Sequence, residues 1–385
     1  MWDIIGDIHG EATKLKKLLH KLGYTQKEEY YFHHPKRKVC FLGDYIDRGQ
    51  NIAESLKIVK TMTERRTASA LMGNHEFNYL AFMTKRAPAH TYCTQIPNKQ
   101  VPDKKIGSSN LNSAQKLRQY VRFNQNKKAN PSSTAKYTPI YVRRRNKRHR
   151  NEVSNTIKEF NRLDDKGVSF IDWMYSRPIY LETPTFRAIH AAWDREAIKI
   201  LRKNPHFVKN KHHITPNLLQ NFHNHEPSKQ ALNLLLKGIT WNLPPPMTFL
   251  DHTGIARDYV RFAWWKSNQA TYLTNINNLA KYLLLNPTKA ERLIKSLHQH
   301  RLPAPNHYLP GYARSEKPLF IGHFWLEQER IQQFNHAILK KAKTPYLLKH
   351  NLCCLDFSAA QGGPLVAYRF NGEKKLTEKN FVWTF

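Results

Sequence analysis

Near its N-terminus the chain repeats one pattern three times: a short apolar run, a glycine, polar side chains and then a helical stretch. The apolar runs span residues 2–6, 38–42 and 68–72. Residues 11–21 and 52–62, and a third stretch from Glu76, carry apolar side chains at helical spacing. Repeated strand–helix units predict an α/β fold, with functional residues at the carboxyl ends of its strands.

Each of these three strand ends carries residues that can bind a metal ion or move a proton. Their sequences are "GDIHG", "GDYIDRG" and "GNHE". The side chains that they supply are Asp7, His9, Asp44, Asp47, Arg48, Asn74 and His75. Each sequence taken alone is also an ordinary turn after a strand, so the case depends on their joint occurrence.

Two later apolar runs end in a histidine, His190 in "RAIHAAWD" and His323 in "FIGHFW". A mixed set of carboxylate oxygens and imidazole nitrogens suits Mn, Fe or Zn better than Mg or Ca. A carboxylate that two such ions share is the usual arrangement for phosphoester hydrolysis. Because five strand ends agree, the sequence predicts a dinuclear metal site.

The charge balance is unusual, with 62 Lys and Arg against 29 Asp and Glu and a net charge of +33. Residues 101–150 alone hold 14 of the basic side chains and one acidic side chain, Asp103. We interpret residues 87–155 as a basic insertion, mostly loop, with one helix around 114–123. The 101–150 stretch is a candidate nucleic-acid contact, and a solvated loop is the alternative.

No apolar run reaches the roughly 18 residues of a membrane span, and no secretory signal precedes the first strand. The four cysteines lack zinc-site spacing. We therefore expect a reduced, cytoplasmic protein without a transmembrane segment. After a helix over 157–174 and a hairpin ending at His190, residues 194–237 are predicted to form a helical cap. All of residues 1–385 are expected to form one domain.

The motif order GDxHG, GDxxDRG, GNHE, His and GH resembles the calcineurin-like metallophosphoesterases. Within them it is most similar to the phosphoprotein (serine/threonine) phosphatase branch, bacterial members included. The resemblance extends to "LKGITWNLP", "KPLFIGHFWL" and "CLDFSAAQGGPLVAYRFNGE" and covers residues 1–85 and about 157–385. It implies a β-sandwich of two mixed sheets flanked by helices.

The resemblance also implies two divalent ions, Mn²⁺ with Fe or Zn as alternatives. It assigns Asp7, His9 and Asp44 to the first ion. It assigns Asp44, Asn74, His190 and His323 to the second. Many relatives outside the phosphatase branch continue as GHxH, whereas Trp325 stands at that last position here, which favours the phosphatase branch.

The chemistry implied is direct attack on phosphorus by a metal-bridging hydroxide. His75 would protonate the leaving oxygen and Asp47 would orient its ring. Arg48 and Asn74 would bind the phosphate, because a guanidinium matches phosphate geometry. The family's second phosphate-binding arginine would be Arg257 or Arg261, with surface ion pairs as the alternative.

We therefore predict a phosphomonoesterase of the serine/threonine protein phosphatase type with a phosphorylated protein as substrate. The alternative is a nucleotide or nucleic-acid phosphoesterase, such as a dinucleoside tetraphosphatase or an RNA-end phosphatase. The same metal site serves both reactions, so the motifs alone leave the substrate open.

Overall fold

The computed structural model describes residues 1–87, 140–163, 165–245, 247–250, 256–273, 275–285, 287–300, 302, 307–326 and 345–385. The helix expected around 114–123 and most of the basic 101–150 stretch lie outside these residues. In the part that is described, no helix has both the length and the apolar character needed to cross a membrane.

The first sheet is five-stranded, in the order β19-β18-β1-β4-β5. Its strands are β1 (Trp2–Ile5), β4 (Lys38–Phe41), β5 (Ala68–Ala70), β18 (Leu365–Phe370) and β19 (Phe381–Thr384). β1, β4 and β5 run parallel to one another, whereas β18 pairs antiparallel with both β1 and β19. The sheet is therefore mixed, and its three parallel strands are the three apolar runs of the N-terminal repeat.

The second sheet is four-stranded, in the order β17-β16-β7-β6. Its strands are β6 (Tyr180–Glu182), β7 (Arg187–Ile189), β16 (Leu319–Ile321) and β17 (Leu352–Cys354). β7, β16 and β17 are parallel, and β6 pairs antiparallel with β7 as the expected hairpin. His190 and His323 directly follow two of the parallel strands.

Aromatic side chains join the two sheets face to face. The Phe186 ring lies 5.7 Å from the Trp2 ring and 5.2 Å from the Phe370 ring. The Phe320 ring of the second sheet lies 5.3 Å from the Tyr368 ring of the first. Large rings at the centre of a dry interface stabilise such a sandwich strongly. The predicted fold class, two mixed sheets flanked by helices, is confirmed.

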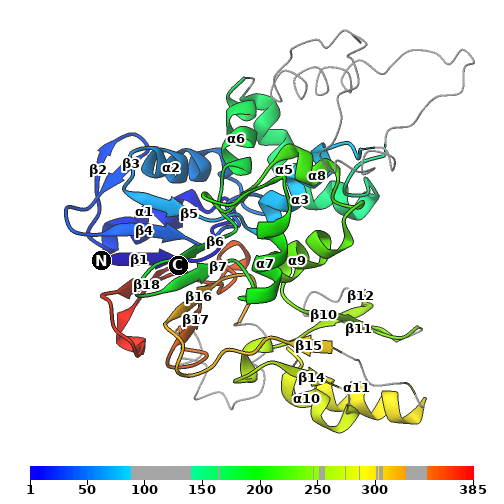
Figure 1. The fold of residues 1–385 in the computed structure, drawn as a ribbon. Helices are drawn as coiled ribbons and strands as arrows, with labels where there is room; N and C mark the ends of the chain where they lie inside the picture. Colours follow the sequence, from blue (N-terminus) through cyan, green and yellow to red (C-terminus); the bar gives the residue numbers. More distant parts are fainter. Residues whose placement is uncertain are drawn as a thin grey trace, which may run out of the picture.

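Helices α1 (Ala12–Lys21) and α2 (Ile52–Glu64) pack against the first sheet, and α3 (Asn74–Met83) starts directly after it (Figure 1). Leu15, Leu18 and Leu19 of α1 are buried. Their spacing puts them on one face of the helix, which is the stripe expected from the sequence.

The segment expected as one helix over 157–174 instead forms α5 (Lys147–Arg162) and α6 (Asp165–Tyr175). α5 begins ten residues earlier than predicted, where the Asn146 side chain accepts a hydrogen bond of 2.8 Å from the His149 N–H. The basic composition of this region concealed a helical stripe, because Val153, Thr156 and Phe160 are all buried. The end of the basic stretch therefore packs onto the domain.

The remaining elements lie around the sandwich (Figure 1). The segment predicted as a cap contains α7 (Arg195–Lys203), β8 (Phe207–Val208), β9 (His213–Ile214), α8 (Pro216–Gln220) and α9 (Glu226–Lys237). Further elements are β2 (Thr25–Glu28), β3 (Tyr31–His33), β10 (Thr240–Asn242), β11 (Phe249–Leu250), β12 (Ala256–Arg257), β13 (Tyr259–Arg261), β14 (Thr271–Leu273), α10 (Leu279–Tyr282), α11 (Pro287–Gln299) and β15 (His307–Leu309). Short 3₁₀ turns lie at Trp264–Lys266, Ile276–Asn278, Ala359–Gln361 and Glu378–Asn380. Of these elements, β2 and β3 lie beside α2, and the cap segment with β10 to β15 lies on the opposite side (Figure 1).

Candidate active site

The carboxyl ends of the parallel strands from both sheets meet at one place. A Cβ at Gly43 would lie 2.5 Å from the Gly73 nitrogen and 3.1 Å from the His190 Nδ1. A Cβ at Gly322 would lie 2.1 Å from Asp7 Oδ1. Gly43 also has a φ of 106°, a conformation that favours glycine. These glycines allow the strand ends, and the side chains that follow them, to approach closely.

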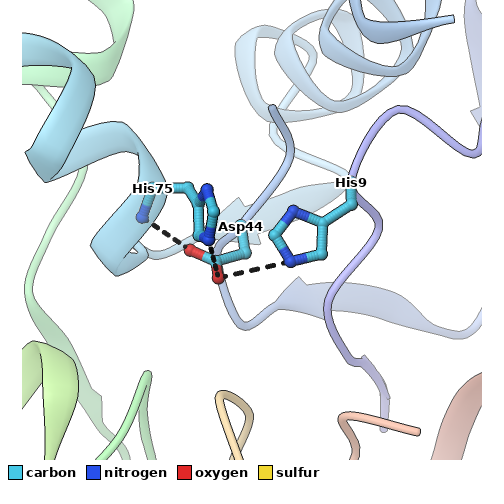
Figure 2. Close-up of side chains that lie close together, drawn as sticks. All are labelled: His9, Asp44 and His75. Atoms are coloured by element: carbon cyan, nitrogen blue, oxygen red, sulfur yellow. Dashed lines mark hydrogen bonds and ion pairs between the residues drawn. The ribbon is translucent and has the colours of Figure 1, made fainter. Parts of the chain in front are cut away.

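Asp44 lies at the centre of the site. Its Oδ2 is 3.5 Å from His9 Nε2 and 3.9 Å from His75 Nε2, so that its carboxylate lies between the two rings (Figure 2). Its Oδ1 is 3.4 Å from His190 Nε2. Two sets of residues, His9–Asp44–His75 and Asp44–His190–His323, each bring their ligand atoms within 4.8 Å of one another. Asp44 is common to both, as a shared carboxylate would be.

Backbone carbonyls fix two of the histidine rings. His9 Nδ1 lies 2.8 Å from the Ile46 carbonyl oxygen and His190 Nδ1 lies 2.9 Å from that of Leu42. In each ring Nδ1–H donates to a carbonyl, so that Nε2 is the nitrogen that faces the site; at His9 it carries a lone pair, and at His190 it would do so once its proton is released. This is the tautomer that a metal ligand requires.

Asn74 joins the second set through its amide oxygen. Its Oδ1 is 2.9 Å from His190 Nε2 and 2.6 Å from His323 Nδ1. Asn74 is the first residue of α3, so the strand end of β5 delivers it directly. All four residues that we predicted for the second ion are thus in one place.

The buried nitrogens of the site test whether it fits a metal. In the residues described, His9 Nε2 and His323 Nε2 are buried and have no hydrogen-bond partner. Burial lowers the pKa of both rings, with Arg48 adding to the effect at His9 and Arg261 at His323. A neutral imidazole whose lone pair accepts no hydrogen bond can bind a metal ion. These residues therefore fit a divalent ion.

The carboxylate at the centre is held ionised. Burial alone would raise the pKa of Asp44, but His190 and His75 hold that pKa well below its usual range. The same pairing raises the pKa of His190 to about 10, against the effect of burial. A cation bound here would take over this pairing, and binding would release the proton of His190.

Asp7, predicted as a ligand of the first ion, lies beside both sets and belongs to neither. Its Oδ2 accepts a hydrogen bond of 3.1 Å from the backbone N–H of His323. Burial and the nearby Asp356 raise the pKa of Asp7 well above its ordinary value. Two buried carboxylates at one edge form an environment that a cation would stabilise, and the ligand role of Asp7 stays a prediction.

His75 is positioned through Asp47 by a residue that the sequence did not reveal. Its Nδ1 lies 2.7 Å from Asp47 Oδ2. Asp47 Oδ1 accepts a hydrogen bond from the Thr156 hydroxyl, and the Asp47 N–H donates to Thr156 Oγ1 at 3.1 Å. Thr156 lies on α5, inside a segment whose polar composition gave no sign of a catalytic contact.

Arg48 lies between the His75 ring and another aromatic ring. Its Nη2 is 3.4 Å from His75 Nε2, and its guanidinium carbon is 4.1 Å from the centre of the Trp325 ring. The backbone N–H of Trp325 in turn donates to Asp356 Oδ2 at 3.0 Å. Sequence analysis missed Asp356, although it follows the end of β17 and the strand-end signal could have found it. The cation–π contact holds the guanidinium at the edge of the candidate metal site around Asp44.

The loop from Asp44 to Arg48 has a strained backbone. Positive φ values occur at His9, Asp44, Asp47, Arg48 and His323, between 47° and 71°. The Glu76 carboxylate accepts hydrogen bonds from the N–H groups of Gly73, Asp44 and Tyr45, at 2.8–2.9 Å. Such strain persists only where the surroundings fix it, and it concentrates at functional sites.

The two candidates for the second phosphate-binding arginine lie in different places. Arg261, on β13, is close enough to His323 to lower its pKa, after the larger effect of burial. Arg257 lies on β12, which pairs with β11 in a separate two-stranded sheet. The electrostatic coupling to His323 therefore favours Arg261 over Arg257 as the candidate for the second phosphate-binding arginine.

Comparisons with known proteins agree with this geometry. The chain is 42% identical over 74 residues to the bis(5'-nucleosyl)-tetraphosphatase PrpE [asymmetrical] of Halalkalibacterium halodurans, covering 19% of this chain and 30% of that protein. Over 73 residues it is 41% identical to the protein of the same name from Oceanobacillus iheyensis, covering 19% and 29%. The matches thus span under a third of these relatives' length.

A cold-active protein-tyrosine phosphatase of a Shewanella species is 12% identical, with a TM-score of 0.38, over 95% of this chain and 74% of that chain. A similarity at this level supports no argument. The calcineurin-like phosphoesterase family model matches residues 3–237, more than half of the chain, and confirms the predicted family. The chain therefore belongs to the calcineurin-like phosphoesterase family and is a hydrolase.

Proposed function

We propose that this protein is a dinuclear-metal phosphoesterase that cleaves the phosphoanhydride chain of dinucleoside tetraphosphates asymmetrically. The observation that carries the chemistry is the Asp44 carboxylate, which is shared by the two sets of ligand atoms. The similarity to PrpE proteins supports the substrate class. An asymmetrical cut of four phosphates leaves one phosphate on one product and three on the other.

Two divalent ions, Mn²⁺ with Fe or Zn as alternatives, would be held by the residues at the strand ends. Asp7, His9 and Asp44 would hold the first, and Asp44, Asn74, His190 and His323 the second. When bound, such ions supply Lewis acidity that polarises the phosphoryl group and lowers the pKa of water.

The chain's own side chains bind the substrate and move the proton. Arg48 and Arg261 bind the oxygens of the reacting phosphate, where negative charge spreads during transfer. His75 gives the proton on Nε2 to the leaving phosphate oxygen. Asp47, which lies 2.7 Å from His75 Nδ1 and is fixed by Thr156, holds the ring in that orientation.

A phosphorylated protein is the second candidate substrate. It is favoured by Trp325, which stands two residues after His323 where many relatives outside the phosphatase branch carry a histidine. Contact of the 101–150 stretch with nucleic acid stays a prediction, because most of that stretch lies outside the described residues.

A substrate panel tests the proposal. With Mn²⁺ present, kcat/KM is measured for diadenosine tetraphosphate, a phosphoserine peptide, a 5′-phosphorylated RNA and p-nitrophenyl phosphate. We expect the highest value for diadenosine tetraphosphate, with ATP and AMP as products. Formation of two molecules of ADP instead would contradict the asymmetrical cut. A higher kcat/KM for the peptide would favour a protein phosphatase.

A further inference from the structure

A compact group of charged residues at the start of α5 and the end of α9 takes no part in the chemistry above. Its members are Arg143, Arg148, Glu152 and Lys237, and we call it the basic cluster. Arg143 Nη2 and Arg148 Nε bind the two carboxylate oxygens of Glu152, the latter at 3.1 Å. Three cations around one carboxylate leave an excess of positive charge.

One buried nitrogen of this cluster lacks a hydrogen-bond partner among the described residues, and a second cation lies beside it. Arg143 Nη1 is buried, and in the described part of the chain nothing accepts its hydrogens. Lys237 Nζ lies 5.4 Å from the centre of the Phe77 ring. Burial and then the Arg143 guanidinium lower the pKa of Lys237 to about 8. Unpaired buried donors and like charges are both costly, and an anion would relieve both.

The register of α5 places the basic cluster beside the reacting groups. Glu152 lies four residues before Thr156, on the same helical face and about 6 Å away along the axis. Thr156 binds Asp47, which orients His75. The cluster is therefore one helical turn from the residue that positions the proton donor.

Two further contacts connect the cluster to the site. Lys237 precedes Gly238, where an added Cβ would lie 2.8 Å from Phe324 Cζ, and Phe324 directly follows His323. On the other side Arg148 contacts the side chain of Tyr259, which lies on β13 two residues before Arg261. Through Tyr259 the cluster is therefore linked to β13, the strand that also carries Arg261.

We propose that Arg143, Arg148 and Lys237 form a subsite for the distal phosphates of the substrate, beyond the phosphate at which the chain is cut. This inference rests on the proposed function, in which one product keeps three phosphates. Guanidinium groups bind phosphate oxygens in pairs and an ammonium adds a point charge. A phosphate monoester has no second phosphate to place there.

The alternative role of the cluster is purely structural, as a group of ion pairs that stabilises the packing of α5 against the end of α9. Mutation of such ion pairs would change stability but would not discriminate between phosphate anions of different length. The distinction between one phosphate and three is therefore the property to measure.

The experiment uses the full chain with Mn²⁺ held at a fixed free concentration. Tripolyphosphate and orthophosphate are compared as inhibitors of p-nitrophenyl phosphate hydrolysis. In Lys237→Gln we expect the inhibition constant of tripolyphosphate to rise about tenfold, as loss of one charge-assisted contact predicts, and that of orthophosphate less than about twofold. Lys237→Arg should retain tight inhibition by tripolyphosphate.

Lys229→Gln is the matched control, because Lys229 lies on the same helix, is paired with Glu226 at 2.8 Å and lies away from the cluster. Arg148→Gln provides a second test at a more exposed position and should also weaken tripolyphosphate selectively. Equal changes for the two inhibitors, or none, would overturn the subsite. If diadenosine tetraphosphate is not cleaved but the selective loss is observed, the subsite stands and the proposed substrate is wrong.

Discussion

The metal ligands and the catalytic loop are held in place by different parts of the molecule. His9, His190 and His323 follow parallel strands, and the first two rings are fixed by carbonyls of the neighbouring strand end. Asp47 and Arg48 lie on a strained loop and are held from outside, by Thr156 and Asn155 of α5. The sheets thus bring together the side chains that can hold metal, and a helix fixes the groups that we propose to bind phosphate and move the proton.

This difference implies that metal binding and turnover are separable. Changes at the strand ends should remove metal and activity together. Changes on α5 should lower turnover while metal content stays constant. The following variants test that separation, from the largest expected effect to the smallest.

Asp44→Asn should have the largest effect, because this carboxylate is common to both sets of ligand atoms. We expect bound Mn²⁺ to fall and kcat for p-nitrophenyl phosphate to fall by at least about 10³-fold, since the ions supply several kcal/mol of transition-state stabilisation. Metal content by elemental analysis and kcat are measured on the same sample. Full metal content with lost activity would contradict the shared-ligand role.

His75→Asn should lower kcat by at least about 10²-fold, as expected when a general acid is removed. Its Nε2 lies 3.9 Å from Asp44 Oδ2, so the metal content of the variant must be measured as well. We expect both ions to be retained. If metal is lost in proportion to activity, His75 is a ligand of the first ion instead of the proton donor.

The strand ends are also the part of the site that the sequence predicts well. Parallel strands bring their carboxyl ends to one edge, so polar residues after each apolar run place His9, Asp44, Asn74, His190 and His323 together without knowledge of the loops. The shared role of Asp44 was expected from the family resemblance and not from the strand pattern. Asp356 also follows the carboxyl end of a parallel strand, two residues after β17. It was missed because the sequence "CLDFS" has no histidine or glycine beside the aspartate.

The contribution of α5 could not be predicted from composition. Its first turn is basic and contains no acidic residue, which is unfavourable beside the positive end of the helix dipole. Its buried residues Val153, Thr156 and Phe160 include a polar one, so the apolar stripe is weak in the sequence. Which side chain reaches Asp47 depends on the packing of α5 against α2, a contact between segments about 100 residues apart.

Thr156→Val should isolate the role of α5. Removing the hydroxyl leaves Asp47 without two hydrogen bonds and loosens the orientation of His75, so we expect kcat to fall about tenfold with metal content unchanged. Ser154→Ala on the same helix is the matched control, since its hydroxyl bonds only the Asn151 carbonyl nearby. Unchanged kcat in Thr156→Val would mean that Asp47 needs no support from α5.

The pH dependence of inhibition by tripolyphosphate should reveal the basic cluster. The pKa of Lys237 is lowered to about 8 by burial and Arg143, with Glu152 opposing, so the ammonium is present at pH 7 and mostly lost at pH 9. The inhibition constant should therefore rise about threefold more over this range in the wild type than in Lys237→Arg, whose guanidinium stays charged. Parallel profiles in the two proteins would show that Lys237 does not meet the anion.

Glu159→Gln should give the smallest effect, and one on stability alone. The Glu159 carboxylate accepts hydrogen bonds from the N–H groups of Ile52 and Ala53, at 3.2 and 2.7 Å, in the first turn of α2. Loss of its charge there should cost about 0.5–1 kcal/mol and lower the thermal midpoint by about 1 °C, with kcat changed less than about twofold. The control is Lys158→Gln, an exposed neighbour. A large fall in kcat would mean that α5 positions the loop from Asp44 to Arg48 through α2 as well as through Thr156. Metal binding and turnover would then be less separable than the contacts of Asp47 indicate.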